Sequence, residues 1–132
     1  MNDPDAAPTL RILVADDDAS LRAVIAETLR GEGYIVDEAE NGVAALERLR
    51  DNIPDLMLVD IVMPELDGNE LIRRCRSIPG CAAVPVVVIS GTHGLPNEAQ
   101  ELGIKAVLVK PFDLGVLVAM IGRLIRRAEA GD

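Results

Sequence analysis

The segment Asp55-Leu56-Met57-Leu58-Val59-Asp60 decides the fold, because it is a nearly continuous apolar run that ends in an acid. An apolar run of this length, without polar alternation, is typical of a strand that is covered on both faces. A second such run is Pro85-Val86-Val87-Val88-Ile89-Ser90, with the proline at its entry, where a missing N–H matters least. Both runs favour a buried parallel sheet with helices on its two faces.

Three further strands and five helices are predicted around these two runs. Apolar side chains at helical spacing, short β-branched runs and turn-forming residues separate the elements along the chain. Strands that alternate with helices in this way pair in parallel through right-handed crossovers, so the sequence predicts a doubly wound α/β fold. The expected strands are Leu10–Ala15, a short strand that begins at Tyr34, and Ala106–Val109. The expected helices are Leu21–Arg30, one from Asn41 to before Pro54, Asn69–Ser77, Asn97–Leu102 and Asp113–Ala128.

The length and composition are those of one globular domain, with 132 residues, of which 49% are hydrophobic and 27% charged. We divide the chain into a flexible N-terminal segment over residues 1–9, one domain over residues 10–127, and a tail or the start of a linker over residues 128–132. No apolar run approaches the ~20 residues that a membrane-spanning helix needs, and residues 1–9 lack the apolar centre of a secretory signal. We therefore expect no membrane association and a cytoplasmic location.

The charge and the aromatic content exclude several classes of ligand. Acidic residues outnumber basic ones by 22 to 13, and the net charge of -9 predicts no direct binding of nucleic acid, whose phosphates would be repelled. Tyr34 and Phe112 are the aromatic residues and tryptophan is absent, which leaves little surface for stacking a base or a flavin. Cys75 and Cys81 fit neither a metal site nor a disulfide framework, so a reducing cytosol is the expected compartment.

Polar side chains follow the carboxyl ends of four predicted strands, where the functional crevice of an open α/β sheet lies. Clustered carboxylates repel one another unless a hard cation such as Mg²⁺ lies between them, and a lysine with a hydroxyl suits the oxygens of a phosphoryl group. An aspartate can also be the nucleophile that forms an acyl phosphate. The residues concerned are Asp16 and Asp17 after the first strand, Asp60 after the third, Ser90 after the fourth and Lys110 after the fifth.

Taken singly, these residues have simpler explanations. Asp18 is expected to cap the following helix, Ser90 could close a turn, and Lys110 before Pro111 could be a solvated lysine. Compatible groups at four independent strand ends are nevertheless difficult to obtain by chance. The set as a whole favours phosphoryl chemistry that depends on a divalent cation.

The same residues lie in four motifs that resemble the receiver domain of two-component signalling, typified by the chemotaxis response regulator. The resemblance extends over about residues 10–127, and the order and spacing of the motifs agree with the family. It implies a flavodoxin-like sheet with strand order 2-1-3-4-5. The motifs are Ile12-Leu13-Val14-Ala15-Asp16-Asp17, Leu58-Val59-Asp60-Ile61-Val62-Met63-Pro64-Glu65-Leu66-Asp67-Gly68, Ile89-Ser90-Gly91 and Val109-Lys110-Pro111-Phe112.

Position by position, the resemblance implies a phosphoacceptor and a metal site. Asp60 resembles the phosphoacceptor and would also be a ligand of the cation. Asp17 resembles a direct ligand of Mg²⁺, or of Mn²⁺ in its place, and Asp16 would act on the cation through water. The backbone carbonyl of Val62, two residues past the acceptor, would complete the protein's share of the metal ligands.

On the phosphate side, Lys110 would pair with the phosphoryl oxygens, and Ser90 with the adjoining Gly91 would form the switch that moves toward a newly bound phosphate. The family also implies a cis peptide bond between Lys110 and Pro111, which fixes the direction of the lysine. One position departs from the family, because Val107 stands where an aromatic residue usually swings inward as the switch hydroxyl moves. A valine has no ring to swing, so we expect that half of the coupling to be absent or replaced.

The resemblance implies a signalling module and not an enzyme with an outside substrate. A histidine kinase, a histidine phosphotransfer protein or a small acyl phosphate would supply the phosphoryl group, and water would later remove it from Asp60. A downstream protein partner or an output domain would recognise the phosphorylated state, and no output domain is expected within this chain. Val62 and Thr92 bracket the site and offer no group that orients an attacking water, which predicts a relatively long-lived aspartyl phosphate.

Other functions fit the residues less well. A small phosphatase or phosphotransferase that used Asp60 would have a second aspartate two residues on, where the chain has Val62. A nucleotide or flavin binder would have a glycine-rich loop after the first strand, where the acidic run 16–18 repels an anion. A pseudo-receiver that binds partners without phosphorylation is disfavoured, because the acidic pair, the acceptor, the hydroxyl and the lysine are all present.

The last helix offers one candidate interaction surface. Val116 and Met120 lie four residues apart on a face other than the predicted core stripe, and Arg123 and Arg127 follow them. An apolar pair flanked by arginines fits a docking face, including a homodimer through this helix, although such pairs are more often ordinary exposed apolar side chains.

Overall fold

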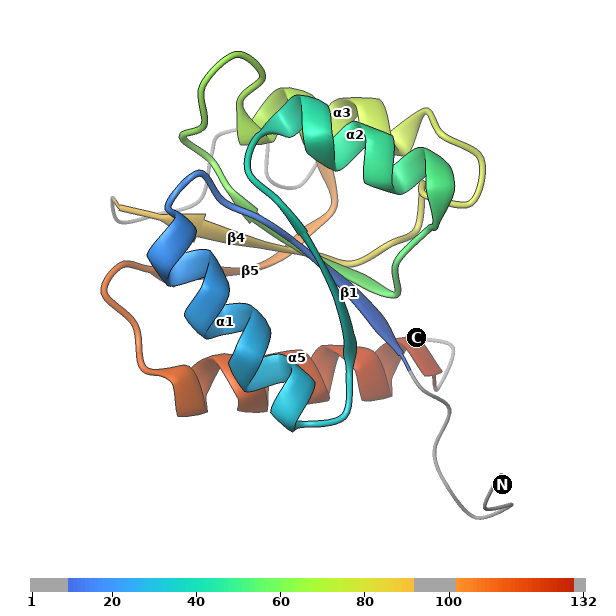
Figure 1. The fold of residues 1–132 in the computed structure, drawn as a ribbon. Helices are drawn as coiled ribbons and strands as arrows, with labels where there is room; N and C mark the ends of the chain where they lie inside the picture. The colour runs from blue at the N-terminus through green and yellow to red at the C-terminus, as the bar shows by residue number, and fades with distance from the viewer. Residues whose placement is uncertain (1–9, 92–101, 130–132) are drawn as a thin grey trace.

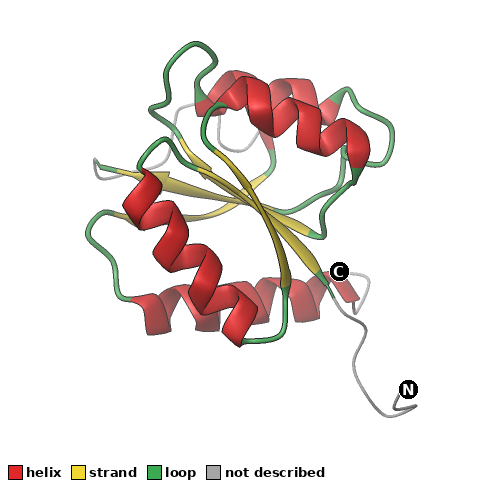
Figure 2. Cartoon of the chain, viewed as in Figure 1, coloured by secondary structure: helices red, strands yellow, loops and turns green. Residues whose placement is uncertain are grey.

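A computed structural model describes residues 10–91 and 102–129, and these residues form a parallel sheet with helices on both faces (Figure 1, Figure 2). Within the described residues there are five strands and four helices. The predicted helix Asn97–Leu102 lies outside the described residues except for its last position. The elements in chain order are β1 Arg11–Ala15, α1 Ala19–Gly31, β2 Ile35–Ala39, α2 Gly42–Asp51, β3 Leu56–Asp60, α3 Gly68–Arg76, β4 Val86–Ser90, β5 Ile104–Val109 and α5 Leu114–Glu129.

The strand order β2-β1-β3-β4-β5 confirms the predicted topology. All four pairs of neighbouring strands are parallel, and in the centre of the sheet Val14 of β1 lies opposite Glu38 of β2 on one side and Leu58 of β3 on the other. This order places β1, β3 and β4 side by side, so that their carboxyl ends share one edge. The edge is the one at which the sequence places its carboxylates.

Two helical layers cover the sheet, with α2 and α3 on one face and α1 and α5 on the other (Figure 1). Successive residues of a strand point to opposite faces, and β1 shows this directly. Leu13 and Ala15 belong to the core under α2 and α3, while Ile12 and Val14 belong to the core under α1 and α5. Because both faces are buried, β3 and β4 have no polar alternation, which explains the apolar runs in the sequence.

Side chains cap the four described helices at their N-termini, and at α5 the cap is Asp113, which accepts from the N–H groups of Gly115 and Val116. As predicted, Asp18 caps α1, and its side chain accepts a hydrogen bond from the backbone N–H of Leu21 at 3.1 Å. Asn41 and Asp67 cap α2 and α3 in the same way. Such caps satisfy backbone donors that have no partner inside the helix, and each contributes about 1 kcal/mol.

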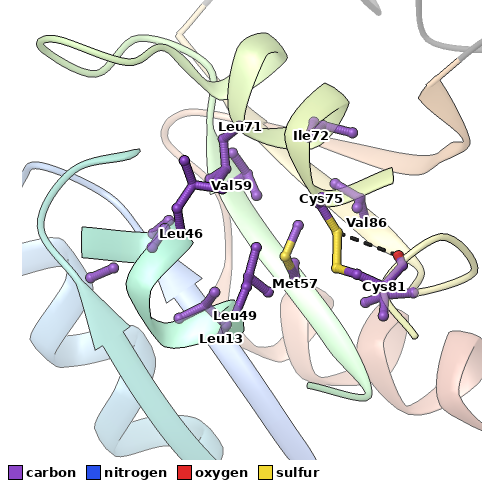
Figure 3. Close-up of a cluster of buried hydrophobic side chains, with 14 of the residues drawn as sticks. Leu13, Leu46, Leu49, Met57, Val59, Leu71, Ile72, Cys75, Cys81 and Val86 are labelled. Carbon is purple, nitrogen blue, oxygen red and sulfur yellow. Dashed lines mark hydrogen bonds between the residues drawn. A yellow bond between two sulfur atoms is a disulfide. The ribbon is translucent and has the colours of Figure 1, made fainter. Parts of the chain in front are cut away.

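The prediction that Cys75 and Cys81 form no disulfide is wrong, because their sulfur atoms are bonded and both residues are fully buried. Helix α3 ends at Arg76, and two turns then bring the chain back, with Ile78 donating to the carbonyl of Cys75 and Cys81 donating to the carbonyl of Ile78. The two Cα atoms are therefore only 5.5 Å apart. Figure 3 shows the pair at the edge of the α2–α3 core beside Val86, with the Cys75 sulfur 3.4 Å from the carbonyl oxygen of Cys81.

Helix α5 only partly matches the predicted interaction surface. Val116 is 53% exposed, but Met120 is half-buried and packs against the core under α1 and α5. The expected apolar pair therefore does not stand free of the core, and its exposed part is Val116 with the exposed Arg123 and Arg127. The helix runs to Glu129, past the residue at which we end the domain. Among residues 10–91 and 102–129, no helix has both the length and the apolar composition to cross a bilayer.

Candidate functional site

The candidate site lies where β1, β3, β4 and β5 end. β3 ends at Asp60 itself and β4 at Ser90, while the acidic pair Asp16-Asp17 directly follows β1 and Lys110 directly follows β5. The structure thus brings together side chains that are far apart in the sequence. Asp16, Asp60 and Ser90 are buried, whereas Asp17 is exposed.

Asp60 is held through both of its carboxylate oxygens. Its Oδ1 accepts a hydrogen bond from the backbone N–H of Val62 at 3.0 Å, and its Oδ2 accepts one from Nζ of Lys110 at 3.1 Å. The residue is 4% exposed, so its carboxylate is almost completely withdrawn from solvent. A charge-assisted bond to an ammonium group fixes the direction of the carboxylate more firmly than a neutral bond would.

Asp16 is fully buried and is only half satisfied. Its Oδ1 accepts from the backbone N–H of Asp18 at 2.8 Å, but Oδ2 has no hydrogen-bond partner in the described part of the chain. Nζ of Lys110 lies 3.6 Å from that oxygen. The pKa of Asp16 is raised to about 6, chiefly by burial and also by the charge on Asp60, against the lowering effects of the Asp18 hydrogen bond and of Lys110.

Lys110 is the positive centre of the site. Partial burial alone would lower its pKa, but the hydrogen bond to Asp60 and the charges of Asp16 and Asp60 outweigh that effect, so its pKa is raised. The ammonium group therefore stays charged throughout the physiological range. It lies against both carboxylates, where an incoming anion would also meet it.

Three carboxylates in this site fit a divalent cation. Asp16, Asp17 and Asp60 each offer one oxygen, and these atoms lie within 4.8 Å of one another. A buried carboxylate oxygen without a hydrogen-bond partner is costly in a folded protein unless something charged or polar meets it. Oxygen donors of this kind suit Mg²⁺, so the donor set and the unpartnered oxygen of Asp16 both agree with the predicted metal site.

Backbone geometry around Asp60 depends on Gly68, a residue that sequence reasoning did not single out. Gly68 donates to the carbonyl of Ile61 at 2.9 Å, and a Cβ at this position would lie 2.5 Å from the carbonyl oxygen of Asp60. The first turn of α3 can therefore pack directly against the end of β3. A glycine after a turn-rich loop is a weak signal in sequence, because the close approach that requires it arises from the packing of two elements.

The remaining predicted positions lie around these groups. The backbone N–H of Lys110 donates to the carbonyl of Ser90 at 2.8 Å, and the Lys110–Pro111 peptide bond is cis. Gly91 is exposed, with open space where a Cβ would stand. Val107 is half-buried, lies opposite Val88 in the sheet and packs against the core under α2 and α3.

Of the two positions expected to flank the site, Val62 lies within the described residues and the other does not. Val62 is 75% exposed and its backbone N–H binds the acceptor carboxylate, while the role of its carbonyl as a metal ligand stays a prediction. Thr92 lies outside the described residues.

Comparison with known proteins assigns this arrangement to a family. Residues 12–122 match the family described as the response regulator receiver domain. The chain belongs to the response regulator receiver family. Phosphorylation-dependent signalling is the general activity of this family, and the flavodoxin-like fold predicted from the motifs is the fold found here.

Individual relatives agree with this receiver assignment. The chain is 36% identical to the response regulator MprA of Mycobacterium ulcerans (strain Agy99) over 126 residues, which cover 94% of this chain and 53% of that protein. It therefore spans about half the length of the curated relatives that it matches.

Solved structures show the same likeness. The chemotaxis response regulator CheY4 of Vibrio cholerae has a TM-score of 0.83 and 26% identity, and the match covers 88% of this chain and 98% of that one. A CheY-like receiver domain protein from Methanospirillum hungatei JF-1 has a TM-score of 0.85 and 26% identity, with 95% of this chain and 100% of that chain covered.

Proposed function

We propose that this receiver accepts a phosphoryl group on Asp60 from a phosphohistidine of a histidine kinase or of a histidine phosphotransfer protein. The observation that carries the proposal is the carboxylate of Asp60, which is buried, oriented by Val62 and Lys110, and close to two further carboxylates. An oriented carboxylate with a neighbouring cationic side chain is suited to nucleophilic attack on an electrophilic phosphorus. Solvated acids on a protein surface have neither property.

The metal belongs to the proposal as well. Asp17, Asp60 and the carbonyl of Val62 would hold Mg²⁺, or Mn²⁺ in its place, with Asp16 acting through water. The cation would neutralise charge on the carboxylates and on the phosphoryl oxygens. The unpartnered Oδ2 of Asp16 supports this assignment, since a water molecule that is bound to the cation could donate to it.

The chain's own residues account for the transfer. An oxygen of Asp60 forms a bond to phosphorus while the bond from phosphorus to the donor's imidazole nitrogen breaks, and the imidazole leaves with the electron pair and takes up a proton. Lys110 moves from the free carboxylate to the phosphoryl oxygens, where it stabilises their charge. Water later cleaves the phosphorus–oxygen bond, which returns Asp60 and releases inorganic phosphate.

The switch that follows is expected to differ from the common form. The hydroxyl of Ser90 would bind the new phosphoryl group and move the loop that begins at Gly91. No aromatic ring can follow this movement at Val107, because that side chain is a valine that packs in the core. We propose that the change at Ser90 and Gly91 reaches a downstream partner or output domain by another route, in a cytoplasmic pathway, and that any self-association uses α5.

Intact-mass spectrometry after incubation with acetyl phosphate tests the proposal. One phosphoryl adduct is expected in the presence of Mg²⁺, and none with EDTA. Asp60→Asn removes the acceptor and should abolish the adduct, whereas Asp51→Asn, which alters an exposed carboxylate on α2, should leave it unchanged. An adduct of equal yield on Asp60→Asn would refute the proposal.

The same sample separates the alternative functions. We propose that the module has no outside substrate, so an aryl phosphate should release one equivalent of product for each protein molecule and then only as much as the slow hydrolysis of the aspartyl phosphate allows. Rapid continued turnover would instead indicate a phosphatase. If neither small donors nor a set of phosphohistidine proteins label the chain, it acts as a pseudo-receiver and the proposal fails.

A further inference from the structure

We infer that Arg22 is a positioning residue for the metal site, an inference that rests on the proposed Mg²⁺-dependent function. Arg22 lies in the first turns of α1, behind the acidic pair. Its Nη1 donates to the backbone carbonyl oxygen of Asp16 at 2.8 Å, and its Nε donates to Oε1 of Glu38 at 3.2 Å. One guanidinium group therefore joins the loop after β1 to the edge strand β2.

The contact holds the peptide that leads into Asp17. The backbone N–H of Asp16 donates to the carbonyl of Ala39 at 3.1 Å, and its carbonyl accepts from Arg22, so both polar groups of its main chain are anchored. The peptide plane between Asp16 and Asp17 consequently has one orientation. Because that plane sets the direction in which the side chain of Asp17 leaves the backbone, Arg22 places a metal ligand that it does not touch.

The start of α1 closes this arrangement into a ring of contacts. Asp18 caps the helix, donates its N–H to Oδ1 of Asp16, and accepts the N–H of Arg22 through its own carbonyl at 2.9 Å. The side chain of Arg22 then returns to the carbonyl of Asp16. Partners that orient metal ligands in this way commonly change metal affinity about 10- to 100-fold when they are removed.

Glu38 holds Arg22 in place and partly offsets its positive charge. Arg22 is 17% exposed and Glu38 31%, so their ion pair is shielded from solvent more than most surface pairs are. Arg30 also donates to Glu38, at 3.3 Å, and to the carbonyl of Val36 at 2.9 Å. Within the described part of the chain, Arg30 makes no hydrogen bond or ion pair with the acidic loop, and this difference makes it a matched control.

Electrostatics and positioning predict opposite signs for the loss of Arg22. Removal of a positive charge near three carboxylates should by itself tighten the binding of Mg²⁺. Loss of the hydrogen bond to the carbonyl of Asp16 should loosen the ligand geometry and weaken binding. Since Arg22→Gln does both, a weaker affinity can only come from the positioning effect.

The experiment is a titration of the wild type and two variants with MgCl2, followed through the amide resonances of the acidic loop. We expect Arg22→Gln to raise the dissociation constant of Mg²⁺ about tenfold. Arg30→Gln, which removes the same charge from the same helix and the same partner, should change it less than about twofold, because exposed charges are screened. Phosphorylation at saturating Mg²⁺ should keep a rate near that of the wild type, so the defect appears in the half-saturating concentration.

Two further variants keep the outcome decisive. Arg22→Lys preserves the charge but cannot donate to both acceptors in the same geometry, so it replaces Arg22→Gln if that variant unfolds and should also bind Mg²⁺ more weakly. Glu38→Gln combined with Arg22→Gln should be no worse than Arg22→Gln alone, since Glu38 acts through the arginine.

The possible failures are distinguishable. A wild-type protein that binds no Mg²⁺ would refute the proposed function itself. If the wild type binds Mg²⁺ and the two glutamine variants behave alike, or Arg22→Gln binds more tightly, the positioning role is refuted while the proposed function stands.

Discussion

Replacement of Asp16, the fully buried acid of the site, should stabilise the metal-free fold. Asp16 is fully buried, and its pKa rises from the ordinary 3.8 to about 6 because burial and the charge on Asp60 disfavour its ionised form. At 1.36 kcal/mol for each pKa unit, that rise corresponds to a destabilisation of about 3 kcal/mol once the carboxyl ionises in the folded protein. Asp16→Asn removes the charge and keeps the shape of the side chain.

The sign and the pH range follow from proton linkage. Because folding raises the pKa of this carboxyl, the folded protein keeps its proton in a range where the unfolded chain has lost it. The free energy of unfolding attributable to Asp16 therefore falls as the pH rises from about 4 to about 6, and is constant above that range. We expect Asp16→Asn to gain about 1–3 kcal/mol at pH 7.5 and to gain little at pH 4, since the pKa of about 6 already includes the attraction to Lys110.

Urea unfolding followed by circular dichroism, with EDTA present, measures this difference at a series of pH values. Glu47→Gln, which alters an exposed carboxylate on α2, is the control and should change the free energy of unfolding by less than about 0.5 kcal/mol. Mg²⁺ at 100 times its dissociation constant should add about 2.7 kcal/mol to the wild type and almost nothing to Asp16→Asn. If Asp16→Asn is less stable than the wild type at pH 7.5, or its gain does not depend on pH, the reasoning fails.

Three further predictions concern backbone and cross-link. Gly68→Ala places a Cβ 2.5 Å from the carbonyl oxygen of Asp60 and should lower the free energy of unfolding by about 1–3 kcal/mol, whereas Gly31→Ala, with open space around it, should not destabilise; urea unfolding of both variants decides. Glu65 has a φ of 68°, so Glu65→Gly should stabilise by about 1 kcal/mol, and a lower thermal midpoint would contradict this. Reduction of the Cys75–Cys81 disulfide releases the short loop that it closes, which gives the unfolded chain more freedom. The free energy of unfolding should fall by about 2 kcal/mol, as unfolding with and without dithiothreitol will show.

The sheet and the composition of the site could be predicted from sequence because both depend on local patterns. Runs such as Leu56–Asp60 and Val86–Ser90 show burial on both faces, and parallel strands necessarily end at the same edge. Asp16, Asp60 and Lys110 can therefore be placed together from the sequence alone. Element boundaries were less predictable. The sequence predicts a start of β5 at Ala106, because the exposed Lys105 interrupts the apolar run. The strand in fact begins at Ile104, and its pairing with β4 is irregular between Val86 and Val87.

Features that arise from two elements meeting could not be read from the sequence. The disulfide depends on the turns that return Cys81 to the end of α3, and the requirement for Gly68 depends on how closely α3 approaches β3. Arg22 looks like an ordinary arginine in an amphipathic helix until the loop after β1 and the edge strand β2 are placed around it. In each case the sequence holds the residue, and only the tertiary arrangement shows its partner.

The measurement that tests the central claim most directly is the location of the phosphoryl group. The protein, phosphorylated with acetyl phosphate and Mg²⁺, is treated with borohydride, which reduces an aspartyl phosphate to homoserine, and its peptides are sequenced by mass spectrometry. We expect homoserine at position 60 and unmodified aspartate at Asp16 and Asp17, because only Asp60 is oriented by both Val62 and Lys110. Homoserine at Asp16 or Asp17 with an intact Asp60, or a phosphoryl group that survives borohydride on another side chain, would contradict the account.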